Sequence, residues 1–265
     1  MCGIVGYVGK ENAASILIDG LSKLEYRGYD SAGIAVLDDS QENKEIEVIK
    51  AKGRLQALRE MTDNGRAVKG CCGIGHTRWA THGEPSVVNA HPHVSKDRKI
   101  AVVHNGIIEN YKEIKEYLQK KGYEFLSETD TEVIAHLLDY YYKGNPLEAI
   151  TKVLGRVRGS YALGILFQEN PGVMYAVRKD SPLIIGKSAQ GNFIASDVPA
   201  ILKYTKTVCY IDDREIAEIT ADSIRFYDVD QEELQKEFKT VEWDAKAAEK
   251  EGFEHFRSEE HTSEL

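Results

Sequence analysis

Apolar residues recur every three or four positions in three stretches of the chain, as on the buried face of an α-helix. These residues are Ala14, Leu17, Ile18, Leu21 and Leu24 in the first stretch, Tyr111, Ile114 and Leu118 in the second, and Val133, Ile134, Leu137 and Leu138 in the third. The first predicted helix ends at Gly28 and the second at Gly122. The third begins at Thr129, which has capping-box spacing to Glu132, and residues 144–146 (Gly-Asn-Pro) stop it.

Short apolar runs with turn residues between them make up most of the remaining chain and predict β-strands. The predicted strands are 3–9, 34–37, 46–51, 73–76, 100–104, 160–167, 173–178, 183–185, 193–195, 208–211, 216–220 and 224–227, with a polar turn at 38–44. From residue 160 onward strand follows strand, while the helices are grouped earlier. This order predicts an α+β protein with antiparallel sheets rather than alternating βαβ units.

Composition narrows the class of protein. The 265 residues are 42% hydrophobic and carry a formal net charge of -9, which argues against nucleic acid or an anionic membrane as the main partner. No apolar run reaches the length of a membrane span, and Lys10 and Glu11 interrupt any signal-peptide pattern early. We therefore expect a cytoplasmic protein, and its length suits one large domain or two small ones with a substantial core.

The four cysteines are Cys2, Cys71, Cys72 and Cys209, and none forms a CxxC pair. So few cysteines indicate a reducing compartment, where the last three serve as small buried hydrophobic residues.

The C-terminal segment differs in character from the rest. Residues 231–256 are rich in Glu, Lys and Ala with few apolar anchors, which predicts a solvated helix or the start of an interdomain linker after a domain spanning 2–230. Residues 257–265 (Arg-Ser-Glu-Glu-His-Thr-Ser-Glu-Leu) resemble the translation of a sequencing-library adapter, so we interpret them as an artefactual tail. On this interpretation the natural protein continues beyond Phe256.

Cys2 directly follows Met1, and a small second residue allows Met1 to be removed. The mature terminus would then carry a thiol and a free α-amine on one residue. The pKa of such an amine is about 7.7–8.0, against about 10.4 for lysine, so it can accept the thiol proton without help from a histidine. The alternative is that Cys2 is simply a small apolar residue that opens a strand.

Two polar patches contain more charged and hydrogen-bonding side chains than a fold requires. Residues 26–33 (Tyr-Arg-Gly-Tyr-Asp-Ser-Ala-Gly) can be a glycine-rich turn after a helix. The second patch, 76–93, holds His76, His82, His91 and His93, which suggest a metal site, but their spacing matches no helical ligand pair and no carboxylate or cysteine stands at ligand spacing. We therefore predict no metal. Arg78 in this patch suits bidentate capture of a carboxylate on a small substrate.

Two further patches offer hydrogen-bonding groups. Asn105-Gly106, after the strand 100–104, is either a tight turn or an oxyanion hole made by the asparagine amide and the glycine N–H. Asp130, in the run 127–132, either favours a helix N-terminus or binds the ammonium group of a substrate.

Taken together, these patches resemble one family. The runs 2–6, 26–33, 77–85, 89–93, 104–110 and 127–137 are similar, in order, to the glutaminase half of the glutamine–fructose-6-phosphate aminotransferase (isomerizing) family. The resemblance covers about residues 2–256. A terminal cysteine is shared with other class II amidotransferases, whereas Thr-Arg-Trp-Ala-Thr-His-Gly at 77–83 is specific to this member. The resemblance implies an N-terminal-nucleophile hydrolase fold, an αββα sandwich of two stacked antiparallel sheets.

The resemblance also implies roles for individual residues. Cys2 attacks the side-chain amide of L-glutamine with its own α-amine as general base, and Asn105 and Gly106 hold the oxyanion. Arg78 binds the α-carboxylate and Asp130 the α-ammonium group. The remaining expected site residues are Thr81 and His82 in the pocket wall, Trp79 beside the exit route of ammonia, and Arg27 in support of the Cys2 region.

No cofactor is implied. Ammonia would pass to a sugar-isomerase domain that converts fructose 6-phosphate to glucosamine 6-phosphate, and that domain is missing after Phe256. The resemblance implies a homodimer for the full-length protein. Two alternatives stay open at this point: the glutaminase domain of another class II amidotransferase, and a binding module that senses glutamine without turnover.

Overall fold

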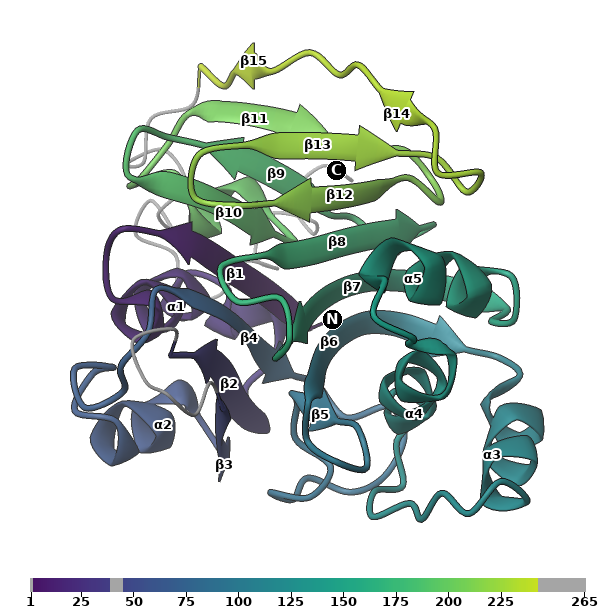
Figure 1. Ribbon diagram of the computed structural model, residues 1–265. Helices are drawn as coiled ribbons and strands as arrows, with labels where there is room; N and C mark the ends of the chain where they lie inside the picture. Colours follow the sequence, from purple (N-terminus) through teal and green to yellow (C-terminus); the bar gives the residue numbers. More distant parts are fainter. Residues whose placement is uncertain (1, 39–44, 243–265) are drawn as a thin grey trace, which may run out of the picture.

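Two antiparallel sheets stack face to face in residues 2–38 and 45–242, which are the residues that the computed structural model describes (Figure 1). The first sheet has the strand order β15 (Lys239–Thr240), β11 (Thr207–Tyr210), β9 (Ile184–Lys187), β10 (Gly191–Ala195), β1 (Gly3–Gly9), β4 (Cys72–Arg78), β2 (Ser31–Leu37) and β3 (Ile46–Lys52). The second has the order β14 (Glu233–Leu234), β13 (Ile224–Tyr227), β12 (Ile216–Ile219), β8 (Met174–Lys179), β7 (Gly159–Phe167), β6 (Ile100–Ile108) and β5 (His93–Val94).

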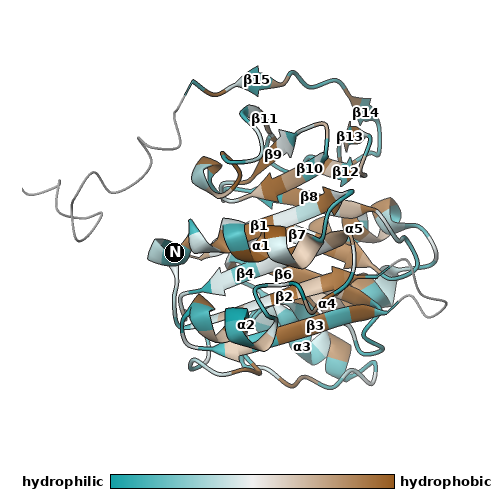
Figure 2. Cartoon of the chain, turned by 90° about the vertical axis from the view of Figure 1, so that its left-hand side faces the viewer, coloured by the Kyte–Doolittle hydropathy of each residue, from teal (hydrophilic) through white to brown (hydrophobic). Residues whose placement is uncertain are grey.

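Helices cover the outer face of each sheet, which gives the predicted αββα sandwich. The first sheet carries α1 (Ala13–Ser22) and α2 (Leu55–Met61), and the second carries α3 (Tyr111–Gln119), α4 (Glu132–Tyr141) and α5 (Pro146–Leu154). Two 3₁₀ turns, η1 (Glu25–Arg27) and η2 (Val198–Ala200), lie in the connections. In Figure 2 the strands carry most of the hydrophobic residues, and polar residues dominate the outer surface of α2.

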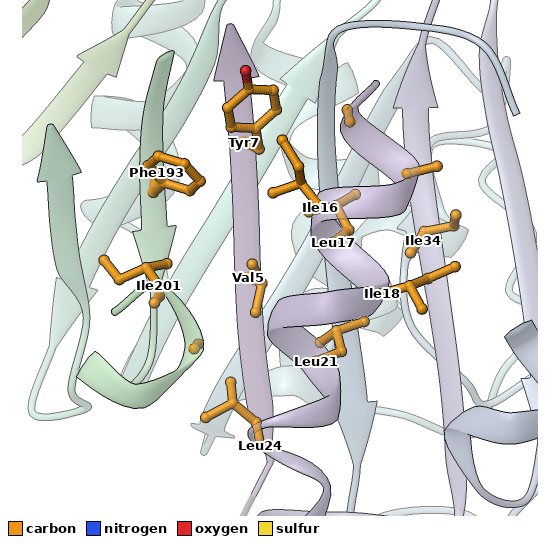
Figure 3. Packing of buried hydrophobic residues seen from close by; sticks show 14 of the residues in the cluster. Val5, Tyr7, Ile16, Leu17, Ile18, Leu21, Leu24, Ile34, Phe193 and Ile201 are labelled. Atoms are coloured by element: carbon orange, nitrogen blue, oxygen red, sulfur yellow. The ribbon is translucent and has the colours of Figure 1, made fainter. Parts of the chain in front are cut away.

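Successive side chains of the central strands point to opposite faces of the sheet, so each strand contributes to two hydrophobic cores. On β1, Val5 and Tyr7 pack with Leu17 and Leu21 of α1, as Figure 3 shows. Ile4 and Val8 point to the other face and join the core between the two sheets. Strands in this position are apolar on both faces, which is why the sequence shows continuous apolar runs instead of strict alternation.

Close approach of the sheets depends on a glycine in β1. A Cβ at Gly6 would lie 2.5 Å from Met174 Sδ and 2.6 Å from Ile194 Cγ1, so a larger residue would separate the layers. Met174 lies on β8 of the second sheet, and Gly6 therefore contributes to the inter-sheet contact.

Two helices were not predicted. The helix α2 has seven residues and buries only Leu55 and Leu58, too few for a periodic signal. The stop expected at 144–146 is also a start, because Asn145 accepts a hydrogen bond from Glu148 N at 3.2 Å and Pro146 occupies the first turn of α5.

The predicted capping box at Thr129 is wrong. Helix α4 begins at Glu132, and Thr131 in the N-cap position makes no side-chain cap bond. The Glu132 carboxylate instead accepts hydrogen bonds from the backbone N–H groups of Leu126 and Ser127, at 2.9 and 2.7 Å. It therefore fixes the preceding loop and satisfies the N–H of Ser127, which is buried.

The solvated helix expected at 231–256 is also wrong for its described part. The strand β14 pairs with β13, β15 pairs with β11, and Leu234 and Phe238 pack on the core between the sheets. The edges of both sheets offer backbone hydrogen bonds, so these two anchors together with Val241, which packs on the core under α1, suffice to hold this segment. Residues 39–44 of the polar turn predicted at 38–44, residues 243–256 of the helix or linker predicted at 231–256, the tail 257–265 and Met1 lie outside the described residues.

Candidate active site

Strand register brings the predicted nucleophile to the predicted arginine. Gly3 of β1 pairs with Thr77 of β4, so Cys2 comes to lie beside the end of β4, where Arg78 and Trp79 follow. Both strands also pack against β6 of the second sheet, which carries Asn105. The site therefore forms where the inner strands β1 and β4 of the first sheet meet β6, the strand next to the β5 edge of the second sheet.

All nine site residues expected from the sequence line one cavity of about 270 Å³. They are Cys2, Arg27, Arg78, Trp79, Thr81, His82, Asn105, Gly106 and Asp130. Their positions in the sequence span 129 residues, so only the stacking of the two sheets brings them together. The contacts of each residue are described in turn below.

The Cys2 thiol is held by the backbone of Trp79. Trp79 N–H donates to Cys2 Sγ at 3.3 Å, and the thiol lies 3.6 Å from the carbonyl oxygen of the same residue. Burial raises the pKa of the Cys2 thiol, while the Trp79 N–H and the nearby Arg78 charge act in the opposite direction. A thiol in this environment needs a base to become a nucleophile.

Asn105-Gly106 is not a turn, because β6 runs through it to Ile108. Asn105 is buried, and its Nδ2 donates to the carbonyl oxygen of Cys2 at 3.0 Å. Gly106 adopts a φ of +127°, and a Cβ there would lie 2.1 Å from Ser160 O of β7. Only glycine fits this backbone conformation, and Gly106 lines the cavity.

Arg78 is buried, and its guanidinium holds the loop that follows it. Nη2 donates to the carbonyl oxygens of His82 and of Gly83, the latter at 2.9 Å, and Nη1 lies 3.4 Å from Glu84 O. In this structure the group expected to bind a carboxylate therefore organises the loop 82–84. A substrate carboxylate would have to share or replace these carbonyl partners.

Asp130 lies in the loop before α4, and it too is buried. Its Oδ2 accepts a hydrogen bond from Ile108 N at 2.7 Å, which ties the loop to the end of β6. Asp130 lines the cavity, and a buried carboxylate there is suited to bind a cation.

The other expected residues form the rim. Trp79 is 47% exposed and meets the Tyr29 ring edge-on at 5.3 Å. His82 meets Tyr111 edge-on at 5.5 Å, with Thr81 next to it. Arg27 forms an ion pair with Asp197 at 2.8 Å, which joins η1 to the segment after β10. Arg27 therefore contributes to the wall through a structural ion pair.

Several residues of the cavity wall were missed by sequence reasoning. They are His91, His104, Ile107, Thr129, Thr131, Ser160, Ser181 and Pro182. The histidines and threonines lie within motifs that the sequence singled out, so proximity along the chain was a usable signal. Ser160, Ser181 and Pro182 offered none, because the sequence does not reveal which strands flank β6.

Three of the four histidines in 76–93 are buried, where His76, His91 and His93 bond to Asn105, Thr131 and Thr129, while His82 lies at the rim. Among residues 2–38 and 45–242, no group of three His, Cys, Asp or Glu side chains is placed to hold a metal ion. No helix in the described part of the chain has the length and apolar character to cross a membrane.

Comparison with known proteins agrees with this geometry. The family described as "Glutamine amidotransferase domain" matches residues 32–242, a span that begins after Cys2 and Arg27. The chain is 58% identical, over 98% of its length, to the glutamine–fructose-6-phosphate aminotransferase [isomerizing] of Clostridium acetobutylicum, and 48% identical to that of Thermus thermophilus. The chain spans 42% of the length of each of these relatives.

A solved structure with a similar fold is the glutamine phosphoribosylpyrophosphate amidotransferase of B. subtilis, complexed with ADP and GMP. It superposes with a TM-score of 0.75 and 26% identity, over 86% of this chain and 49% of that one. The fold, the cavity residues and the matched family agree, and the chain belongs to the glutamine amidotransferase domain family.

Proposed function

We propose that this chain hydrolyses the side-chain amide of L-glutamine to glutamate and ammonia, with Cys2 as nucleophile. The observation that carries the proposal is the single cavity in which a thiol, an amide donor, a buried arginine and a buried carboxylate converge. A zwitterionic amino acid with a reactive side-chain amide matches this set of groups. The family match and the relatives named above support the same substrate.

In the proposed mechanism, removal of Met1 frees the α-amine of Cys2, which accepts the thiol proton. The sulfur attacks the amide carbon, and the oxyanion forms beside Asn105 Nδ2 and Gly106 N–H. Asn105 Nδ2 carries two N–H bonds and Cys2 O takes one, so the second remains for the oxyanion. The C–N bond then breaks, and the departing nitrogen takes up a proton as ammonia. Water hydrolyses the thioester to glutamate and restores the thiol.

Substrate orientation follows from the charged groups. Arg78 would exchange its bonds to the carbonyls of His82 and Gly83 for the α-carboxylate, while Asp130 binds the α-ammonium group. Thr81 and His82 would enclose the substrate from the rim, and Trp79 would border the exit of ammonia. Arg27 supports the wall through its ion pair with Asp197.

The proposal is tested by measuring glutamate release together with the mass of the mature N-terminus. We expect loss of Met1, turnover in the wild-type chain, and a drop to background in Cys2→Ala. Cys71→Ser is the matched control, because Cys71 lies outside the cavity, and it should keep the wild-type rate. Retained Met1 together with no glutamate release would favour a binding module that senses glutamine, which tight binding without turnover would establish.

We further propose that the ammonia serves the conversion of fructose 6-phosphate to glucosamine 6-phosphate, through an isomerase domain outside this chain. The support is the name shared by relatives that match 98% of the chain. The alternative is a glutaminase that serves another acceptor. The structural similarity to a phosphoribosylpyrophosphate amidotransferase is the observation that supports it. A gene sequence that continues past Phe256 into a sugar-isomerase domain would decide for the first.

We propose a cytoplasmic homodimer for the full-length protein, without nucleic-acid or membrane partners. The net charge of -9 and the low number of cysteines, four in 265 residues, support this setting. Light scattering of the full-length protein tests the dimer, and cell fractionation tests the location.

A further inference from the structure

A buried histidine, His76, is hydrogen-bonded to the side-chain amide of Asn105. His76 Nε2 lies 2.9 Å from Asn105 Oδ1 and 3.0 Å from the carbonyl oxygen of His104. On its other side, Asn105 Nδ2 reaches the carbonyl oxygen of Cys2 at 3.0 Å. The Asn105 amide is therefore hydrogen-bonded to the buried His76 on one side and to the backbone of Cys2 on the other.

The directions of these bonds follow from the partners. The His104 carbonyl can only accept, so His76 Nε2 must carry the proton. The atom of Asn105 that faces this N–H must then be the oxygen. The Cys2 carbonyl can also only accept, which independently requires nitrogen on the opposite side of the amide. Both constraints give the same orientation, with the amide N–H groups toward Cys2.

The His76 ring has little freedom to leave this position. It is fully buried on β4 and stacks on the His91 ring, with centroids 4.1 Å apart and planes 13° from parallel. His91 is fixed in turn, because its Nδ1 accepts from His104 N at 3.2 Å and its Nε2 lies 3.4 Å from Thr131 Oγ1. The contacts that hold His91 thus come from β6 and from the start of α4.

We propose that His76 is a positioning residue, which locks the Asn105 amide with its nitrogen toward Cys2 so that it can donate to the oxyanion. This inference rests on the proposed glutaminase function. Burial lowers the pKa of His76 to about 3, so the ring is neutral in solution near pH 7 and carries one proton, on Nε2. The opposite nitrogen, Nδ1, is buried without a hydrogen-bond partner among the described residues. His76 therefore acts through Asn105 and not as a base for the thiol.

Kinetics of three variants in the full chain test the proposal. His76→Phe keeps a flat ring for stacking on His91 but loses the N–H, and we expect kcat to fall by roughly 10- to 100-fold with KM for glutamine within twofold of wild type. His76→Gln places an amide N–H near the position of Nε2 and should recover most of the lost kcat. His136→Phe removes a buried histidine on α4 that contacts Glu132 instead of Asn105, and it should stay near the wild-type rate.

A double-mutant cycle separates positioning from general destabilisation. In the Asn105→Ala background, His76→Phe should reduce kcat by less than twofold further, because the group through which it acts is absent. Losses that multiply in the double variant, or a Gln variant no better than Phe, would overturn the proposal. The alkylation rate of Cys2 by iodoacetamide, together with the melting temperature, shows whether each variant retains a folded site.

A measurement on the wild-type chain makes the test independent of variant folding. In protein labelled with ¹⁵N-histidine, we expect the His76 ring to show a protonated Nε2 and a bare Nδ1 between pH 6 and 8. The opposite tautomer would refute the orientation argued above. If wild-type protein releases no glutamate, the proposed function fails while this spectrum still tests the orientation. If Cys2→Ala abolishes turnover but His76→Phe does not slow it, only the role of His76 fails.

Discussion

Gly106 is a residue of the candidate site whose backbone geometry excludes a side chain. Its φ of +127° lies in a region that disfavours side chains, and a Cβ would approach the backbone oxygen of Ser160 to 2.1 Å. Because Gly106 neighbours Asn105, any shift of β6 that relieves this contact also displaces the amide that faces Cys2. Backbone strain and site geometry are therefore linked at this position.

We predict that Gly106→Ala lowers the free energy of unfolding by roughly 1–3 kcal/mol and kcat by 100-fold or more. Gly122→Ala is the matched control, because Gly122 also has a positive φ, +85°, but a Cβ there would meet nothing within 4 Å. Urea denaturation and glutamate release measure both effects. Equal losses in the two variants would show that the close contact with Ser160 has no special role.

Asp130 combines a structural contact with a charge, and one substitution separates them. Asp130→Asn keeps an oxygen that can accept from Ile108 N and removes only the negative charge. We predict that KM for glutamine rises at least tenfold, because the substrate ammonium loses its counter-charge, while kcat at saturation changes less. Steady-state kinetics check this, with the exposed Asp63→Asn as control. An unchanged KM would assign the ammonium group to another partner.

At the scale of elements, the loop that carries Thr81 and His82 is fastened at two points. The Arg78 guanidinium donates hydrogen bonds to the carbonyl oxygens of residues 82–84. Asn89, also buried, donates to Glu84 O at 3.0 Å and to Glu128 Oε2 at 3.2 Å, and accepts from Glu128 N at 2.9 Å. The loop before α4, which contains Asp130, is therefore joined to the loop after β4, although neither belongs to a strand at that point.

We predict that Asn89→Ala loosens both loops, because it removes three hydrogen bonds from a buried position at a cost of about 1–3 kcal/mol. Hydrogen exchange should accelerate over residues 82–90, and KM for glutamine should rise several-fold. Asn192→Ala is the matched control: Asn192 is equally buried and donates to Thr220 O at 2.7 Å, far from the cavity. The same exchange pattern in the control would rule out a local link.

At the scale of the whole molecule, the interface between β4, β6 and α4 contains a cluster of buried histidines. Burial lowers the pKa of His76 and of His93 to about 3, and it also lowers the pKa of His91 and His104. The nearby charges at His93 are Lys50, Glu132 and Arg78. In the unfolded chain each histidine titrates near its ordinary value of about 6.5.

The sign of the pH effect follows from these shifts. Below pH 6.5 the unfolded chain binds protons that the folded chain does not, so the free energy of unfolding should fall as the pH is lowered toward 3. Above about pH 6.5 this contribution is fully present and constant. Each neutral buried histidine contributes a slope of roughly 1 kcal/mol per pH unit within this window.

We predict that His93→Gln reduces the loss of stability between pH 7 and pH 5, because one fewer histidine is protonated only in the unfolded state. Urea denaturation at the two pH values measures it, with His82→Gln at the rim as control. A variant that loses as much stability as wild type would show that His93 does not titrate as its burial requires.

Much of the architecture was predictable from periodicity. The helix stripe of α1 and the run of strands from residue 160 mark elements whose burial pattern repeats along the chain. The helix α2 and the strands β14 and β15 escaped prediction because they are short and are held mainly by neighbours distant in sequence. The predicted capping box is wrong for a related reason. The Glu132 carboxylate accepts hydrogen bonds from the backbone N–H groups of Leu126 and Ser127 instead of taking part in a helix cap.

The sequence by itself determined which groups are available: a thiol at position 2, an arginine at 78, an Asn-Gly pair at 105 and a carboxylate at 130. Side-chain chemistry is local, so it can be read residue by residue. Only the tertiary structure decided that these groups share one cavity, that Asn105-Gly106 continues a strand, and that His76 orients the Asn105 amide. Those facts depend on strand register and on the stacking of two sheets. Both bring together residues that are far apart in the sequence, so no local pattern reveals them.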